Sequence, residues 1–281
     1  MTTTSSKLIL AHDSVTEGLF KFRPYNTSDD IDRVKKLLSG QLYFAVCEQL
    51  NDPFEMRILL SPEPSDRLRL KGVLKGMLNV PGLKHLSPAK RLLRADQIAS
   101  RLDKQPKVLK DAATKHYARM QKECFIYCMS ATRAHPLLWS HYADMHKGLC
   151  IQFDHTKVPF AGASKVEYST QYPIVVYPFI DISDLTQKGI LTKAQYWSYE
   201  QEYRLFSVRM DNEFWHLGLE WPDLHTATVR EGLVTGITLG ARMPDDAKHD
   251  LMSHCGKHHP EITIEQAEIS KDQFAIKFRS V

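Results

Sequence analysis

A basic segment divides this chain into parts of unlike composition. Between Pro64 and Glu123 there are fifteen Lys or Arg and five Asp or Glu, a net charge of +10. The whole chain of 281 residues carries only +4, so the remainder is acidic, at −6. Apolar residues recur at helical spacing inside the segment, whereas strand-like runs flank it on both sides. We therefore predict a β-rich core with a basic helical insertion at about residues 64–123.

The order of the flanking patterns favours an α+β fold. Helical and strand patterns do not alternate regularly, as they would in a parallel βαβ protein. We predict a single α+β domain over residues 1–281, with a split sheet or β-sandwich of about six to eight strands. The expected strands are residues 18–23, 42–46, 125–129, 149–153, 165–168, 202–208, 234–239, 262–268 and 274–278, and the expected helices are about 28–39, 135–145 and 244–258.

Composition indicates an ordinary soluble protein. Hydrophobic residues make up 43% of the chain and charged residues 25%. No apolar run approaches the roughly 18 residues that a membrane span requires. The first residues are polar and lack the order of a signal peptide. We expect a cytoplasmic protein without a membrane partner.

A group of histidines surrounds Cys255 in the predicted helix near the C-terminus. His254 and His258 share one helical face, and His249 and His259 lie close by in the sequence. Because no second group of ligands occurs at zinc spacing, a polar surface helix is preferred and no metal site is predicted.

Two glutamates separated by one residue are the main candidates for catalysis. They lie in the run Trp197–Val208, whose aromatic and branched residues predict a strand from its middle onward. Glu200, Glu202 and Arg204 would then share one strand face. Such carboxylates can hold a ribose hydroxyl, stabilise an oxocarbenium ion and accept a proton, which suits cleavage of an N-glycosidic bond such as that of NAD. The alternative is a solvated stripe with internal salt bridges.

Five motifs together resemble a bacterial family known as domain of unknown function 2971. The family name supplies no activity. The motifs are Leu19–Arg23, Asn51–Glu55, Trp139–Gly148, Trp197–Arg204 and Ile237–Gly240.

A more distant resemblance connects the chain with ADP-ribosyltransferases that have an early arginine, a central serine-threonine pair and a late Glu-x-Glu. Arg23, Ser130 with Thr132, and Glu200 with Glu202 follow that order. The resemblance implies a split β-sheet or β-sandwich core of that type. It also implies that Arg23 binds the NAD phosphates or ribose and that Ser130 and Thr132 brace the nicotinamide side. Glu202 would hold the ribose hydroxyl, and Glu200 would orient or deprotonate the acceptor.

Tyr142 and Asn51 complete the predicted cofactor-binding set. Tyr142 is expected in a pocket wall or the core, because large aromatic side chains first bury area. Asn51 belongs to a polar loop with Asp52 and Glu55, for which function and a structural Asx-turn are both open.

Structural alternatives exist for the other site residues. Arg23 could cover a sheet edge. Ser130 and Thr132 could cap a helix that begins at Pro136.

The basic insertion leaves the partner open. Its cations could attract a nucleic-acid acceptor, or they could form a solvated helical face. A toxin or phage-defence effector would fit the transferase hypothesis. The alternatives are a non-catalytic nucleic-acid-binding or partner-binding protein, and a metal-dependent nuclease that uses Asp52, Glu55 and the glutamate pair.

Overall fold

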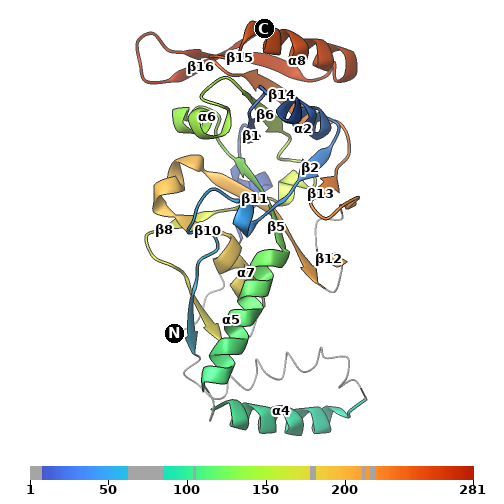
Figure 1. Ribbon diagram of the computed structural model, residues 1–281, viewed down its shortest axis with the longest axis vertical. Helices are drawn as coiled ribbons and strands as arrows, with labels where there is room; N and C mark the ends of the chain where they lie inside the picture. The colour runs from blue at the N-terminus through green and yellow to red at the C-terminus, as the bar shows by residue number, and fades with distance from the viewer. Residues whose placement is uncertain (1–7, 63–84, 104–105, 178–181, 211–212, 216–218) are drawn as a thin grey trace. The chain divides into compact units, whose positions relative to one another are not determined.

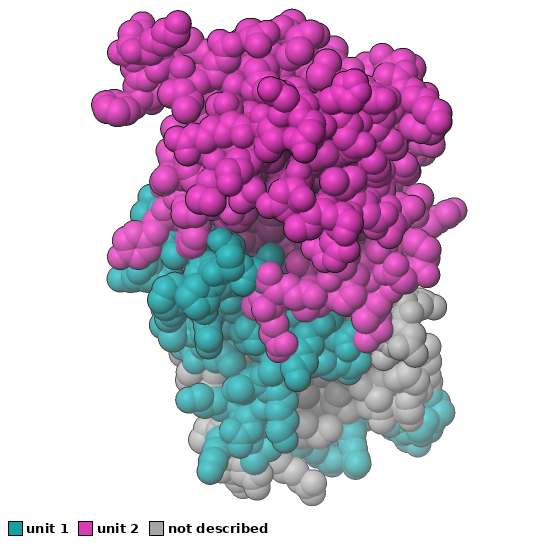
Figure 2. Space-filling model, turned by 45° about the horizontal axis from the view of Figure 1, so that its top comes forward, with its two compact units in different colours: residues 1–5, 50–123, 167–195 teal, residues 6–49, 124–166, 196–281 magenta. Residues whose placement is uncertain are grey.

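The computed structural model describes residues 8–62, 85–103, 106–177, 182–210, 213–215 and 219–281. It mixes helices and sheets, so the α+β class is confirmed. The chain forms two compact units, each built from separate segments (Figure 2). Unit 1 comprises Met1–Ser5, Leu50–Glu123 and Glu167–Gln195, and unit 2 comprises Ser6–Gln49, Cys124–Val166 and Tyr196–Val281.

Unit 2 contains a ten-stranded sheet that carries the predicted Arg, Ser and Glu motifs. Eight strands form its main path, in which every neighbouring pair is antiparallel except the parallel pair β14 and β15 (Figure 1). The short strands β3 (Ala45–Val46) and β7 (Ser164–Lys165) pair with β5 and β11. The path runs β12 (Glu213–Trp215), β11 (Glu202–Met210), β5 (Cys124–Ser130), β1 (Leu19–Arg23), β6 (Leu149–Phe153), β14 (Val234–Leu239), β15 (Thr263–Ile269) and β16 (Ile276–Ser280).

Pairing within this sheet is weakest between β1 and β5. These strands share a single registered pair, Phe20 with Ser130. By contrast, β1 pairs with β6 along its whole length, and β5 pairs with β11 from Cys124 to Ser130. Beyond the Phe20 pair, the Lys21 ammonium donates to the backbone carbonyl oxygen of Cys128 at 2.6 Å. The two halves of the sheet are therefore joined, between β1 and β5, by backbone pairing at one position.

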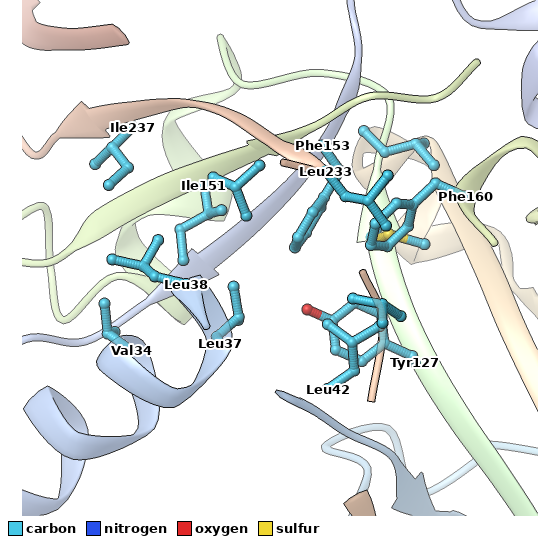
Figure 3. Packing of buried hydrophobic residues seen from close by; sticks show 14 of the residues in the cluster. Val34, Leu37, Leu38, Leu42, Tyr127, Ile151, Phe153, Phe160, Leu233 and Ile237 are labelled. Carbon is cyan, nitrogen blue, oxygen red and sulfur yellow. The ribbon is translucent and has the colours of Figure 1, made fainter. Parts of the chain in front are cut away.

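Side chains on the two faces of the sheet form two separate apolar clusters. Alternation along β1 explains the division, because Leu19 enters one cluster while Phe20 and Phe22 enter the other. Helices α2 (Ser28–Leu38) and α8 (Asp245–His258) contribute to the Leu19 cluster, part of which is shown in Figure 3. Helix α6 (Pro136–Tyr142) contributes to the Phe20 cluster.

Local sequence explains the ends of α2. Its N-cap is Thr27, which forms a capping box with Asp30. The helix ends before Gly40, whose φ of +84° and close approach to the Val229 carbonyl oxygen suit a residue without a Cβ atom.

Three predicted elements differ in extent. The strand expected at residues 42–46 is divided into β2 (Gln41–Tyr43), which pairs with β13 (Thr226–Thr228), and β3. The strand expected at 165–168 is likewise divided into β7 and β8. The helix expected to reach Met145 ends at Tyr142, because residues 144–146 all have left-handed φ values of 43–71°.

Unit 1 combines short parallel strand pairs with helices. Part of the predicted basic insertion, residues 63–84, lies outside the described residues. The single-domain hypothesis and the insertion boundaries stay predictions. In the described ranges no helix has the length and apolarity of a membrane span. The elements are β4 (Leu59–Pro62) with β9 (Ile174–Tyr177), β8 (Glu167–Ser169) with β10 (Thr192–Ala194), α4 (Pro88–Asp103), α5 (Pro106–Glu123) and α7 (Ile182–Ile190).

The remaining elements are short. Unit 2 also contains α1 (Ala11–Ser14) and the 3₁₀ helices η1 (Cys47–Gln49) and η3 (Phe160–Gly162). A further 3₁₀ helix, η4 (Gln195–Glu200), leads directly to β11.

Candidate carboxylate site

Glu202 opens strand β11 as half of a buried ion pair. Glu202 is 3% exposed and Arg204 is fully buried. Arg204 Nε donates to Glu202 Oε1 at 2.7 Å, and Arg204 Nη2 donates to Oε2 at 3.2 Å. The predicted shared face is thus confirmed for these two residues. The alternative of a solvated stripe with internal salt bridges is right about the salt bridge and wrong about solvation, because both side chains are buried. The two-point contact fixes the orientation of the carboxylate.

Glu200 does not belong to the strand, contrary to the prediction. It ends η4, and Gln201 follows with a left-handed φ of 46°, so alternation begins only at Glu202. The carboxylate of Glu200 is nevertheless buried, and it accepts a hydrogen bond from Tyr142 Oη at 2.6 Å. Helix α6 therefore supports the second acid of the Glu-x-Glu motif.

Ser130 connects the end of β5 with both glutamates. It is the registered partner of Glu202, and its hydroxyl lies 2.6 Å from the carbonyl oxygen of Glu200. The same hydroxyl accepts from the N–H of Thr132 at 3.1 Å. The alternative in which Ser130 or Thr132 caps α6 is wrong, because the N-cap is His135. Thr132 instead accepts from the N–H of Ala134.

We refer to Ser130, Tyr142, Glu200, Glu202 and Arg204 as the carboxylate site. Its members come from β5, α6, η4 and β11, and all belong to unit 2. Two acids in fixed orientations beside a hydroxyl and a phenol can bind sugar hydroxyls and transfer a proton.

A second polar group lies where β1 and β5 part. Lys21 Nζ is 4.6 Å from the ring centroid of Tyr127. The Tyr127 hydroxyl is buried without a hydrogen-bond partner among the described residues, and Tyr127 lies among apolar side chains (Figure 3). Arg23, on the same strand face as Lys21, makes no ion pair with a described residue. We refer to Lys21, Arg23 and Tyr127 as the donor cluster.

Electrostatics connects the donor cluster with the carboxylate site. Burial, and after it the charge of Arg23, lower the pKa of Lys21 to about 8, whereas Cys128, Glu202 and Glu200 act in the opposite direction. Burial raises the pKa of Tyr127, and Arg23 opposes that rise. The two glutamates are therefore close enough to influence Lys21.

The predicted residues do not all share one face. Alternation places Arg23 on the face of Leu19, whereas Ser130 and Glu202 share the face of Phe20. The narrow β1–β5 contact separates the two groups. The sheet-edge alternative for Arg23 is wrong, because β1 lies between β5 and β6.

Asn51 lies in unit 1, so its predicted place in an NAD site stays a prediction. Its neighbour Asp52 forms the expected Asx-turn, in which Oδ1 accepts from the N–H of Phe54 at 2.9 Å. Asp52 and Glu55 are both buried.

Sequence reasoning missed Lys21 and Tyr127. A signal was present, because Lys21 interrupts an apolar strand and buried lysines are rare without a partner. Tyr127 offered no comparable signal, since its apolar neighbours are those of any buried strand.

Partly exposed rings from α6 and η4 border the carboxylate site. His135 stacks on Tyr199 with ring centroids 4.9 Å apart, and Trp197 lies 6.0 Å from Tyr199. His141 contacts both Trp197 and Tyr142. These rings can pack against a planar ligand group.

Histidines and a cysteine gather near the C-terminus, where the sequence predicted a polar surface helix. The rings of His254 and His258 lie 4.8 Å apart, and Cys255 is a buried thiol whose pKa burial raises to about 11. No group of three or more His, Cys, Asp or Glu within the described residues is arranged to hold a metal ion.

Residues 138–205 match one protein family, described as Protein of unknown function (DUF2971). The matched segment includes Tyr142, Glu200, Glu202 and Arg204, and it does not extend to Arg23 or Ser130. No curated protein and no solved structure matches the chain. The match thus contains both acids of the carboxylate site without assigning them a role.

Proposed function

We propose that this protein is an NAD-dependent ADP-ribosyltransferase, or an NAD glycohydrolase, with its chemistry at the carboxylate site. One observation carries the proposal. The strands that bear Glu202, Ser130 and Arg23, which are far apart in sequence, are consecutive neighbours β11, β5 and β1 in one sheet. Glu202 is also buried opposite Ser130 rather than exposed to solvent.

The geometry suits stabilisation of a positively charged sugar. When the bond between C1′ and nicotinamide breaks, its electron pair leaves with nicotinamide and the ribose becomes oxocarbenium-like. The oriented Glu202 carboxylate would stabilise that charge and hold a ribose hydroxyl. Glu200, positioned by Tyr142, would accept the proton of the water or acceptor group that attacks C1′.

The donor cluster supplies charge that NAD would complement, and to reach both groups NAD would have to cross the sheet where β1 and β5 part. Lys21 and Arg23 are two cations on one strand face, and Tyr127 adds a buried hydroxyl without a partner among the described residues. A pyrophosphate would offset the repulsion between the two cations and accept from all three side chains. This assignment extends the role proposed for Arg23 to Lys21 and Tyr127.

A macromolecular acceptor completes the proposal. The basic helices of unit 1 favour nucleic acid, and we expect a toxin or phage-defence effector that acts in the cytoplasm.

The buried Glu202–Arg204 pair favours a second candidate, a non-catalytic nucleic-acid-binding or partner-binding protein in which this pair is structural.

Release of nicotinamide from NAD tests the proposal. Wild-type protein should release it, and Glu202→Gln should lower the rate by about 100-fold or more. The matched control is Glu231→Gln, because Glu231 is exposed and lies outside the carboxylate site. Absence of turnover together with absence of NAD binding in calorimetry would reject the proposal.

Folding of the variants has to be verified separately. Glu202→Gln removes the ion pair between Glu202 and the buried Arg204, so thermal unfolding of each variant accompanies the assay. Glu200→Gln retains the ion pair and should also reduce transfer to the acceptor. Full activity in both folded variants would contradict the assigned roles.

A further inference from the structure

Helix α5 has one buried side and one charged side. Ala113, Tyr117 and Met120 are buried, and the Tyr117 hydroxyl donates to the carbonyl oxygen of Met56. These contacts fix the rotation of the helix about its axis. The residues on the opposite side of α5 are exposed.

Three cations follow one another along this exposed side. Lys115, Arg119 and Lys122 are exposed, and their spacing of four and three residues places them in one row about 10.5 Å long. None of them forms an ion pair with a described residue. We refer to them as the cationic row.

The row maintains repulsion within the helix. Like charges three and four residues apart destabilise a helix. The effect of the positive charge is visible at His116, whose pKa is lowered by burial and by Arg119. An external polyanion would remove this repulsion and release its own counterions.

The composition of the surrounding helices favours a duplex over a single strand. Single-stranded nucleic acids are usually bound by exposed aromatic side chains that stack on bases. The described parts of α4 and α5 expose no Phe, Trp or Tyr, because their one such residue, Tyr117, is buried. Contacts to phosphates are therefore the available mode of binding.

The shape of the element favours DNA over RNA. The major groove of B-form DNA, about 12 Å wide, admits an α-helix, whereas that of A-form RNA is too narrow for side chains to enter. From the exposure, spacing and charge of these residues, we propose that the cationic row is a phosphate-contacting surface for duplex DNA. This inference deepens the nucleic-acid partner proposed above, on which it rests, and it does not depend on the NAD chemistry.

Fluorescence anisotropy with a labelled 20-base-pair DNA duplex, without NAD, tests the inference. The triple variant Lys115→Glu, Arg119→Glu, Lys122→Glu should weaken binding at least about tenfold. The slope of log K against log salt should become shallower by about 0.9 for each phosphate that the variant no longer neutralises. Because the assay contains no NAD, its outcome is independent of whether the proposed enzyme is active.

A matched triple variant controls for net charge. Arg230→Glu, Lys257→Glu, Lys271→Glu alters three exposed cations of unit 2 of the same types. It should weaken binding less than about threefold, since a charge that touches no phosphate acts mainly through screened electrostatics. Equal losses in both triples, no binding by the wild type, or equal affinity for duplex RNA or single strands would overturn the proposal. Helix content measured by circular dichroism confirms that both triples fold.

Discussion

Lys21 is a half-buried charged residue in a strand whose buried residues are apolar. Its ammonium lies where β1 and β5 separate, with a backbone carbonyl oxygen as its hydrogen-bond acceptor and no carboxylate in direct contact among the described residues. Such a residue reduces stability, because its charged form is partly desolvated. A lysine that lowers stability is expected at such a position where a ligand binds to its charge.

Replacement of Lys21 by Met should stabilise the protein. The pKa of Lys21 is about 8 in the folded chain and 10.5 for an ordinary lysine, so at pH 7 its charge opposes folding. We expect Lys21→Met to raise the free energy of unfolding by about 1–3 kcal/mol at pH 7. Urea denaturation measures this gain.

The sign of the pH effect provides a control. Between pH 8 and 10.5 the folded wild type loses the proton while the unfolded chain retains it, so wild-type stability rises with pH. The gain from Lys21→Met should therefore shrink across this window. A gain that is absent at pH 7, or unchanged at pH 10, would contradict the assignment.

The turn after α6 has an unusual backbone conformation. Asp144, Met145 and His146 are consecutive non-glycine residues with positive φ, an arrangement that requires support from neighbouring structure. A Cβ atom on Gly148 would lie 2.1 Å from the Arg23 carbonyl oxygen, and one on Gly240 would lie 2.2 Å from that of His146. The turn thus closely joins the ends of β1, β6 and β14.

Gly148→Ala should disrupt this junction. The obstructing atom belongs to the backbone, so β1 or the turn must shift, and we expect a loss of at least about 2 kcal/mol in the free energy of unfolding. Gly162→Ala is the control, because a Cβ atom there meets nothing within 4 Å. Similar stabilities of the two variants in urea denaturation would show that the turn can relax.

Several elements could be predicted because their signals are local. The strand Val234–Leu239 and the helix ending at His258 have the extents that apolar patterns and Pro244 indicated. Glu200 was misplaced because a left-handed Gln201 has no sequence signal of its own. Non-glycine residues with positive φ are held there by tertiary contacts.

The candidate site was predictable in residue order but not in geometry. Arg23, Ser130 and Glu202 were selected from the sequence, yet their strands became neighbours only through long-range pairing. Strand alternation alone predicted that Arg204 lies beside Glu202. That Arg23 lies on the sheet face opposite Glu202 depends on the register between β1 and β5, which the sequence does not reveal.

Acid stability of the whole molecule should depend on hydrogen-bonded carboxylates at the surface. The pKa of Asp154 is lowered to about 2, mainly by the Thr156 hydroxyl. Burial opposes this effect and is smaller than it, and Lys157 and the Thr156 N–H lower the pKa as well. The pKa values of Asp223 and Asp250 are also lowered by hydrogen bonds, from the His225 N–H and from Tyr25. These groups stabilise the fold while they remain ionised.

We therefore expect the free energy of unfolding to fall as pH decreases through the window from about 4 to about 2. The folded pKa of Asp154 lies below its ordinary value of 3.8, so its contribution is complete above that value and lost towards pH 2. Thr156→Val should make the pH dependence shallower, whereas Thr114→Val should not, since the Thr114 hydroxyl donates to the backbone carbonyl oxygen of Lys110. Urea denaturation at pH 2.5, 4 and 6 measures the difference.

The interleaving of the two units sets an order for their completion during translation. All segments of unit 1 have been synthesised by Gln195, whereas unit 2 still lacks β11, β14, β15 and β16 at that point. A nascent chain can thus finish its smaller body while the larger sheet exposes the edge of β5 that β11 later covers. Since β11 brings Glu202 to that edge, any activity of the carboxylate site would be withheld until most of the polypeptide has left the ribosome.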